Sequence, residues 1–257
     1  MRGLMLHCGG TPVSRTEIGL VDLPEATRTF HPMAHSDLLD EVEYAVGRIP
    51  GIEIYAEEHG LNHGGSQYFG LLHLRRESPF GDIYETIMGL RNSHNKSLSA
   101  GVVIGKNVFV CDNLAFCGDI RVGRKHTRKI STELPGLIRE AAMRLLHIAE
   151  RDDSRTESYM GKIISEETAA HSLLKMYETG GVPAQSLGNI WKEFMEPKHV
   201  EHLNENGDRT LWTLSQAITE IHRPTPMNLL TEYTKRTIQQ TRILDAVAGV
   251  DYEVLEV

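Results

Sequence analysis

The chain has 257 residues, of which 40% are hydrophobic and 24% charged, and it carries a formal net charge of −8. This composition is typical of a soluble globular protein with one large domain or two small ones. No apolar run approaches the roughly 20 residues that span a bilayer, and the amino-terminal apolar stretch is too short for a signal peptide. We therefore expect a cytoplasmic protein with no membrane partner.

The three cysteines are odd in number and form no Cys-x-x-Cys pair. They are Cys8, Cys111 and Cys117. This pattern argues against a disulfide framework and against a zinc ribbon. We expect reduced thiols.

The first elements are predicted to be a helix and a hairpin. Ser36 can cap a helix over residues 37–47, which Pro50-Gly51 would end. Residues 52–57 and 67–75 alternate apolar and polar side chains on either side of a glycine-rich connection. They therefore predict a β-hairpin.

Further strands should complete an antiparallel sheet of five or six strands. The β-rich segments are 83–91, 97–104, 108–111 and 120–122. Gly105-Lys106-Asn107 is typical of a tight turn between two of them. A long helix opening at Ser131 or Thr132 carries a core-facing stripe, so it should cover one face of the sheet.

The second half is predicted to be entirely helical. Residues 151–155, RDDSR, are charged and poorly patterned, so they indicate a boundary between a domain over 1–150 and a helical part over 151–257. Helices are expected at 165–178, 184–195, 209–222 and 227–247, separated by glycine and proline. The predicted class is thus α+β. The apolar surface of the helical part suits a core or the interface of a homo-oligomer.

Positive charge is concentrated in the middle of the chain. Between Ile87 and Ser131 there are eight Lys or Arg and two acids, a balance of +6 that leaves −14 for the rest. Such asymmetry points to a polyanionic partner. The predicted nucleic-acid-binding residues are Arg91, Lys96, Arg121, Arg124, Lys125, Arg128 and Lys129. The alternative is a solvated sheet edge that Lys and Arg protect from aggregation.

This basic segment mixes bidentate and point-charge phosphate donors, as a nucleic-acid backbone requires. Five engaged cations would give a salt slope of about −3.5 on single strands or about −4.5 on duplex. Nearby aromatic residues would stack bases if they face outward. They are Tyr68, Phe69, Tyr84, Phe109 and Phe116.

Catalytic and metal sites are less well indicated. His94 and His126 are candidate acid–base groups, although Asn92 to Asn95 also suit a capped turn. His59 and His63 lie four apart, a spacing that holds metal well on a helix, but the neighbouring glycines argue against a helix. No Walker loop, dinucleotide fingerprint or catalytic triad is found, so we expect no cofactor and favour binding over catalysis.

Three motifs in this region occur in a recognisable order: LRNSHNKSLS, then VFVCDNLAFCGDI, then RKHT before a long helix. They resemble the phage and plasmid-like proteins of domain-of-unknown-function family 932, over roughly residues 4–149 with a weaker echo at 210–220. The matching residues are Asn92, Ser93, His94, Cys111, Asn113 and His126, with Asn95 in place of the family's Asp. The resemblance implies a protein of a phage, plasmid or integrated element, often accompanied by recombination or anti-restriction genes, and it transfers no catalytic residues.

Two functional hypotheses of different classes follow, with a third beside them. The first is nucleic-acid binding, in the manner of proteins that bind or anneal single-stranded DNA in recombination. The second is a metal-assisted hydrolase or nuclease that uses His94 and His126. The third is a defence-countering module whose acidic helical half binds another protein.

Overall fold

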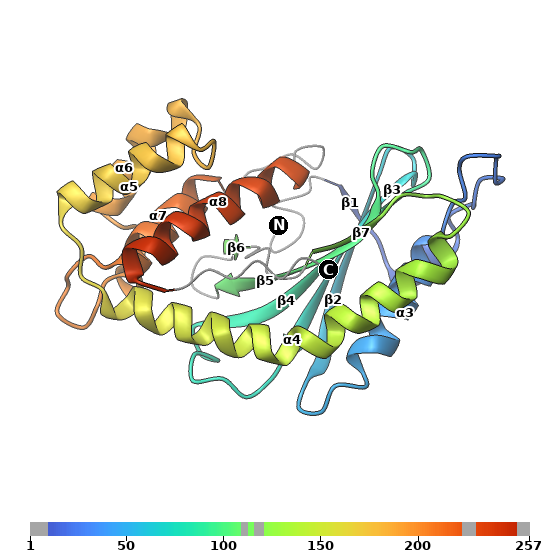
Figure 1. Cartoon of the computed structure of the whole chain (residues 1–257), viewed down its shortest axis with the longest axis horizontal. Helices are drawn as coiled ribbons and strands as arrows, with labels where there is room; N and C mark the ends of the chain where they lie inside the picture. Colours follow the sequence, from blue (N-terminus) through green and yellow to red (C-terminus); the bar gives the residue numbers. More distant parts are fainter. Residues whose placement is uncertain (1–9, 109–112, 116–120, 223–229, 251–257) are drawn as a thin grey trace.

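The computed structural model describes residues 10–108, 113–115, 121–222 and 230–250 (Figure 1). Within them one antiparallel sheet runs in the order β1-β2-β3-β4-β5-β6, and β7 also pairs with β5. The strands are β1 (Thr11–Pro12), β2 (Glu53–Asn62), β3 (Gln67–Arg75), β4 (Tyr84–Ser93), β5 (Ala100–Val108), β6 (Asn113–Ala115) and β7 (Arg121–Arg124). The antiparallel sheet is confirmed, and the two-residue β1 brings the number of described strands to seven.

Two helices lie between β1 and β2, and the other described helices follow β7. They are α2 (Arg15–Gly19), α3 (His35–Val46), α4 (Ile130–Gly161), α5 (Glu166–Glu178), α6 (Leu187–Met195), α7 (Leu211–His222) and α8 (Leu230–Ala248), with short 3-10 turns at Ala184–Ser186 and Val200–His202. The α+β class and the helical carboxyl-terminal part are therefore confirmed. Among the described helices, none combines the length and the apolar character that crossing a membrane requires.

The strand register brings three connections to one end of the sheet. Asn62 pairs with Gln67 across the 63–66 turn, and Gln67 pairs in turn with Ser93, where β4 ends. Ala100, the first residue of β5, pairs with Arg124, the last residue of β7. The turn 63–66, the connection 94–99 and the segment 125–129 therefore lie together, and we call them the loop end.

The predicted hairpin of residues 52–57 and 67–75 is confirmed as β2 and β3. Its turn depends on glycine because Gly64 and Gly65 adopt φ of 65° and 88°. The turn predicted at Gly105-Lys106-Asn107 is wrong, since β5 runs straight through it. Residues Lys106 to Val108 of β5 pair antiparallel with β6.

The helices α3 and α4 pack on one face of the sheet, and α4 continues beyond the strands toward α7 and α8 (Figure 1). Leu38 and Val42 of α3 meet Leu134 and Ile138 of α4 in a buried cluster with the sheet. The predicted stripe on α4 is thus confirmed, apart from Leu146, which is exposed at its outer edge. The helix α3 starts at His35 with Ala34 as its cap, so the predicted capping by Ser36 is wrong.

Residues 151–155 do not interrupt the helix, because α4 continues to Gly161. The division into parts over 1–150 and 151–257 stays a prediction. A second buried cluster gathers α5, α6, α7 and α8 around Trp212 and Phe194. It includes Tyr159 from α4 and Tyr84 from the start of β4. The long helix therefore joins the sheet core to the helical core.

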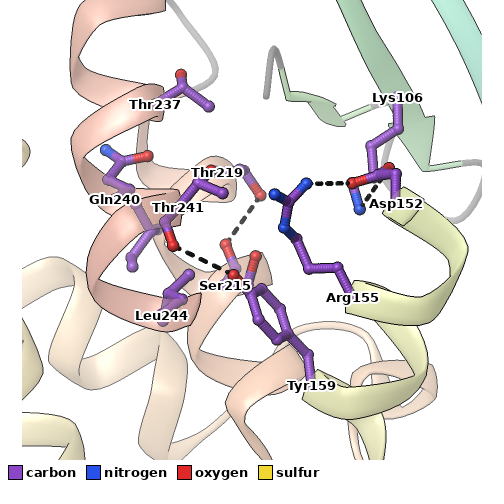
Figure 2. A pocket seen from close by; sticks show the side chains of 11 residues that line it. Lys106, Asp152, Arg155, Tyr159, Ser215, Thr219, Thr237, Gln240, Thr241 and Leu244 are labelled. Atoms are coloured by element: carbon purple, nitrogen blue, oxygen red, sulfur yellow. Dashed lines mark hydrogen bonds and ion pairs between the residues drawn. The ribbon is translucent and has the colours of Figure 1, made fainter. Parts of the chain in front are cut away.

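Charged residues at this junction face inward rather than into solvent (Figure 2). Asp152 accepts from Lys106 and from Arg155, each at 3.0 Å. Arg155 also pairs at 2.9 Å with Asp245 of α8, which accepts from the Tyr159 hydroxyl at 2.6 Å. Burial disfavours ionised Asp152, but the two cations outweigh it and hold the pKa of its carboxyl below the ordinary value.

These side chains border a cavity of about 30 Å³ between α4, α7 and α8, lined on the helix side by hydroxyls such as Ser215 and Thr219 (Figure 2). A space of that size holds about one water molecule. On the sheet side, Asp153 of α4 binds Arg76 at 2.6 Å and accepts from the hydroxyl of Tyr84. The buried ion pairs of Asp152, Asp153 and Arg155 thus explain why the charged residues 151–155 stay within a continuous helix.

Replacing Arg155 with Met should destabilise the protein strongly, because Asp245 is fully buried and would lose its cationic partner. Breaking a buried ion pair from one side costs about 3–5 kcal/mol. Urea unfolding measures this change. The control Arg144→Met removes a half-exposed pair with Glu140 and should cost less than about 0.5 kcal/mol. Equal losses in both variants would contradict the role given to the buried pair.

Candidate nucleic-acid interface

The loop end is closed by backbone and side-chain hydrogen bonds between segments far apart in sequence. The backbone N–H of His94 donates to the Ser66 carbonyl at 2.8 Å, and the Asn95 amide donates to the Ser66 hydroxyl at 3.0 Å. The backbone N–H of His31 donates to the His126 carbonyl at 3.0 Å. The stretch before α3 thus becomes part of the same site.

Asn92 organises the interior of this site. Its Nδ2 donates to the Met33 carbonyl at 2.8 Å and to Nδ1 of His35 at 3.0 Å. Its Oδ1 accepts from the backbone N–H of Ser93 at 2.9 Å, which fixes the orientation of the amide. Fully buried, the amide joins β4 to the start of α3.

The partners of His35 specify its tautomer. Nε2 donates to the Gly65 carbonyl at 2.9 Å, while Nδ1 accepts from Asn92. A neutral ring with its proton on Nε2 satisfies both contacts. Burial lowers the pKa of His35 to about 4; the Gly65 carbonyl opposes this shift, and the charges of protonated His94 and His126 would add to it.

Ser93 and His94 fold the connection that follows β4. The Ser93 hydroxyl donates to the Leu98 carbonyl at 2.8 Å and accepts from the Leu98 N–H at 3.0 Å. His94 donates from Nε2 to the Met33 carbonyl at 3.0 Å and stacks on His35 at 3.9 Å. Burial lowers the pKa of His94. The Asn-Ser-His motif therefore forms a capped turn, and its imidazole points inward.

His126 lies beside this turn and is also buried. The centroid of its ring lies 5.3 Å from that of Phe30. Burial lowers the pKa of His126, and the charge of a protonated His94 would lower it further. Within the described residues, neither ring nitrogen of His126 has a partner in hydrogen-bonding geometry. The structure thus brings the two candidate histidines together, and both lie under the surface.

The predicted cations differ in their surroundings. Lys96, Lys125 and Arg128 are exposed, and the structure shows no ion pair for them within its described part. Arg124 and Lys129 both pair with Glu133 of α4, Lys129 at 3.7 Å. Among the predicted cations whose side chains the structure describes, Lys96, Lys125 and Arg128 thus keep their charge without an ion pair.

The remaining predicted contacts contribute less. Arg91 is partly buried and donates to the Ser99 hydroxyl at 3.2 Å. Arg121 is the first residue of β7 and Asn113 the first residue of β6. The structure describes the backbone of both residues but not their side chains. Cys111 falls outside the described residues altogether.

Five aromatic residues were predicted to stack on bases if they face outward, and three of them face the core instead. The exposed fractions of Tyr68, Phe69 and Tyr84 are 0%, 1% and 2%, so their rings serve the core and cannot reach a base. Both faces of β3 and β4 are covered, which removes the outward orientation that stacking needs. Phe109 and Phe116 lie outside the described residues.

His59 and His63 do not share a helix face. His59 lies in β2 and meets the Tyr68 hydroxyl at 3.1 Å, whereas His63 occupies the exposed turn with φ of 50°. In residues 10–108, 113–115, 121–222 and 230–250, no three His, Cys, Asp or Glu side chains gather closely enough to hold a metal ion. The metal site considered for this pair is not formed there.

His73 makes a separate polar cluster on the sheet. Its ring lies 2.7 Å from Glu85 and 3.0 Å from Glu58. Burial favours the neutral ring, but hydrogen bonds to the two carboxylates outweigh it and raise the pKa of His73 to about 9. Sequence reasoning missed this triad and the part played by His35, because neither belongs to a local motif.

Replacing Asn92 with Asp should destabilise the protein by about 1–3 kcal/mol, because the donor to Met33 and His35 becomes a buried acceptor. The carboxylate would also favour protonated His35. The matched control is Asn206→Asp at an exposed position outside the loop end, which should cost less than about 0.5 kcal/mol. Urea unfolding of both variants tests this, and comparable losses would refute the role of Asn92.

The pH dependence of stability should report His35. Its folded pKa of about 4 lies below the ordinary value of 6.5, so the unfolded chain binds more protons between these values. Stability conferred by the neutral ring is therefore present above pH 6.5 and is lost as the pH falls toward 4. In His35→Gln the slope of unfolding free energy against pH should be smaller by about 1.4 kcal/mol per unit in this window. A slope equal to that of the parent protein would contradict the assignment.

Comparison with protein-family models, curated proteins and solved structures yields no match for this chain. The resemblance to the phage and plasmid-like family therefore stays a prediction. Function has to be argued from the geometry of the loop end.

Proposed function

We propose that this protein binds the sugar-phosphate backbone of nucleic acid through the loop end, with single-stranded DNA as its partner. The observation that carries the proposal is the exposed trio of Lys96, Lys125 and Arg128, presented by two connections that the strand register holds together. A local positive field of this kind attracts phosphates although the whole chain carries −8.

The conformation of Lys96 supports a functional role for its loop. Its φ of 66° lies in the left-handed region, which non-glycine residues rarely adopt. The loop maintains this conformation through the Ser93 and Asn95 side chains on either side. Backbone strain retained by surrounding hydrogen bonds is common at binding sites.

The contact is expected to be dominated by phosphates. Three cations without compensating acids supply a charge interaction that is independent of base sequence. Since Tyr68, Phe69 and Tyr84 are buried, they add no base stacking. Affinity should consequently be modest for one chain and strongly dependent on salt.

Association of several chains would strengthen such binding. The helical part exposes large apolar side chains, among them Leu174, Tyr177 and Val200, with exposed fractions of 51%, 47% and 72%. We propose that this part supports a homo-oligomer, because linked weak sites bind one strand with a much higher combined affinity. A role in recombination for a phage or plasmid-like element fits such an assembly.

Fluorescence anisotropy with labelled DNA at several salt concentrations tests the proposal. Three engaged cations predict a slope of log K against log salt of about −2 per chain on single strands, or about −2.7 on duplex. Lys96→Ala and Lys125→Ala should each weaken binding and reduce the slope by about 0.7. The exposed Lys192 of α6 provides the control, since Lys192→Ala should leave both quantities unchanged.

Two results would exclude the proposed function. One is the absence of binding at low salt to any strand. The other is binding that survives the double substitution of Lys96 and Lys125 with the same affinity and salt slope.

A further inference from the structure

A pocket of about 230 Å³ opens beside the loop end, between the stretch that precedes α3 and the start of α4. Its position is fixed by the His31 to His126 backbone hydrogen bond, which draws residues 23–33 against the basic segment 125–129. Arg128, one of the three uncompensated cations, lies on its wall. The pocket therefore adjoins the proposed path of the phosphate backbone.

Part of the pocket wall is apolar. Leu23, Pro24, Met33 and Ile130 line it, and Leu23 is 51% exposed. At about 230 Å³ the pocket is smaller than the roughly 300–1,000 Å³ clefts that hold drug-sized ligands. Its size and lining suit one flat, apolar-faced ring system.

The polar groups around it include His31, whose Nε2 is buried and has no hydrogen-bond partner among the described residues. The guanidinium of Arg128 is suited to a phosphate, and the hydroxyl of Ser131 lies in the first turn of the 32-residue α4. The carboxylate of Asp37 faces the same pocket and would repel a phosphate, but it accepts hydrogen bonds from ring or exocyclic N–H groups. An anion beside an apolar ring with N–H donors is the chemistry of a nucleotide.

We infer that this pocket holds one unpaired nucleobase of the bound strand, with the adjoining phosphate at Arg128. The inference rests on the proposed function and deepens it by giving the site a preference for single strands. A base inside a duplex is stacked and paired, so it would have to leave the helix before it could enter. The pocket thereby supplies the base contact that the buried Tyr68 and Phe69 cannot provide.

Three labelled probes of equal length separate base binding from backbone binding. They are a mixed-sequence single strand, a strand of the same charge in which every base is replaced by an abasic spacer, and the duplex. The protein should bind the single strand about tenfold more tightly than the abasic strand, as expected when roughly 55 Å² of apolar base surface is buried. Its affinity for the duplex should likewise be below that for the single strand.

A pocket-filling variant provides the structural test. Ala26 is an exposed residue on the pocket wall, so Ala26→Trp should occupy the space without disturbing the core. This variant should bind the single strand only as well as the abasic strand, while its salt slope stays that of the parent protein. The control Ala170→Trp, at an exposed position of α5, should retain the preference.

The outcomes distinguish the two claims. Equal affinity of the parent protein for the single and abasic strands overturns the nucleobase pocket and leaves backbone binding intact. A preference that Ala26→Trp retains overturns it as well. Failure to bind any of the three probes at low salt overturns the proposed function itself, and the pocket inference with it.

Discussion

The side-chain amide of Asn92 is the constraint on which the loop end depends. It donates to the Met33 carbonyl and to His35, while its oxygen holds the backbone of Ser93. These contacts require a neutral imidazole at His35, because Nδ1 must accept a hydrogen bond. Burial of the ring acts in the same direction, since desolvation disfavours the protonated form. The interior of the loop end is therefore neutral, while its exposed cations lie at the surface.

The molecule separates this site from its most strongly charged interior. Strand β4 runs from Tyr84, beside the buried ion pairs of α4, to Ser93 at the loop end. Ten residues of strand place these two regions about 30 Å apart. The long α4 spans the same distance and joins both hydrophobic clusters. One continuous helix therefore connects the loop end to the helical part.

Local patterns predicted what depends on neighbours in sequence. Alternation gave the hairpin of β2 and β3, and helical spacing gave the buried stripe of α4, because each rests on a periodic apolar face. The charged residues 151–155, which predicted a boundary, stay helical because Arg155 pairs with Asp245 ninety positions away. The turn predicted at Lys106 failed because its charge is neutralised by Asp152 of α4.

In the candidate site, too, local patterns were predicted from the sequence and long-range contacts were not. Clustered Lys and Arg in the sequence located the basic loops, but not the pairing of Arg124 and Lys129 with Glu133, which depends on where α4 begins. The Asn-Ser-His motif was found, whereas its partner His35 lies 57 positions from Asn92 and carries no signal of its own. The pocket beside Arg128 arises from the same long-range closure.

The most direct test of this account is the tautomer of His35 in the folded protein at neutral pH, read from the nitrogen shifts and couplings of its ring by NMR. The account predicts a neutral ring that is protonated on Nε2, with Nδ1 unprotonated and accepting a hydrogen bond from the Asn92 amide. A proton on Nδ1, or a fully protonated ring, would contradict it.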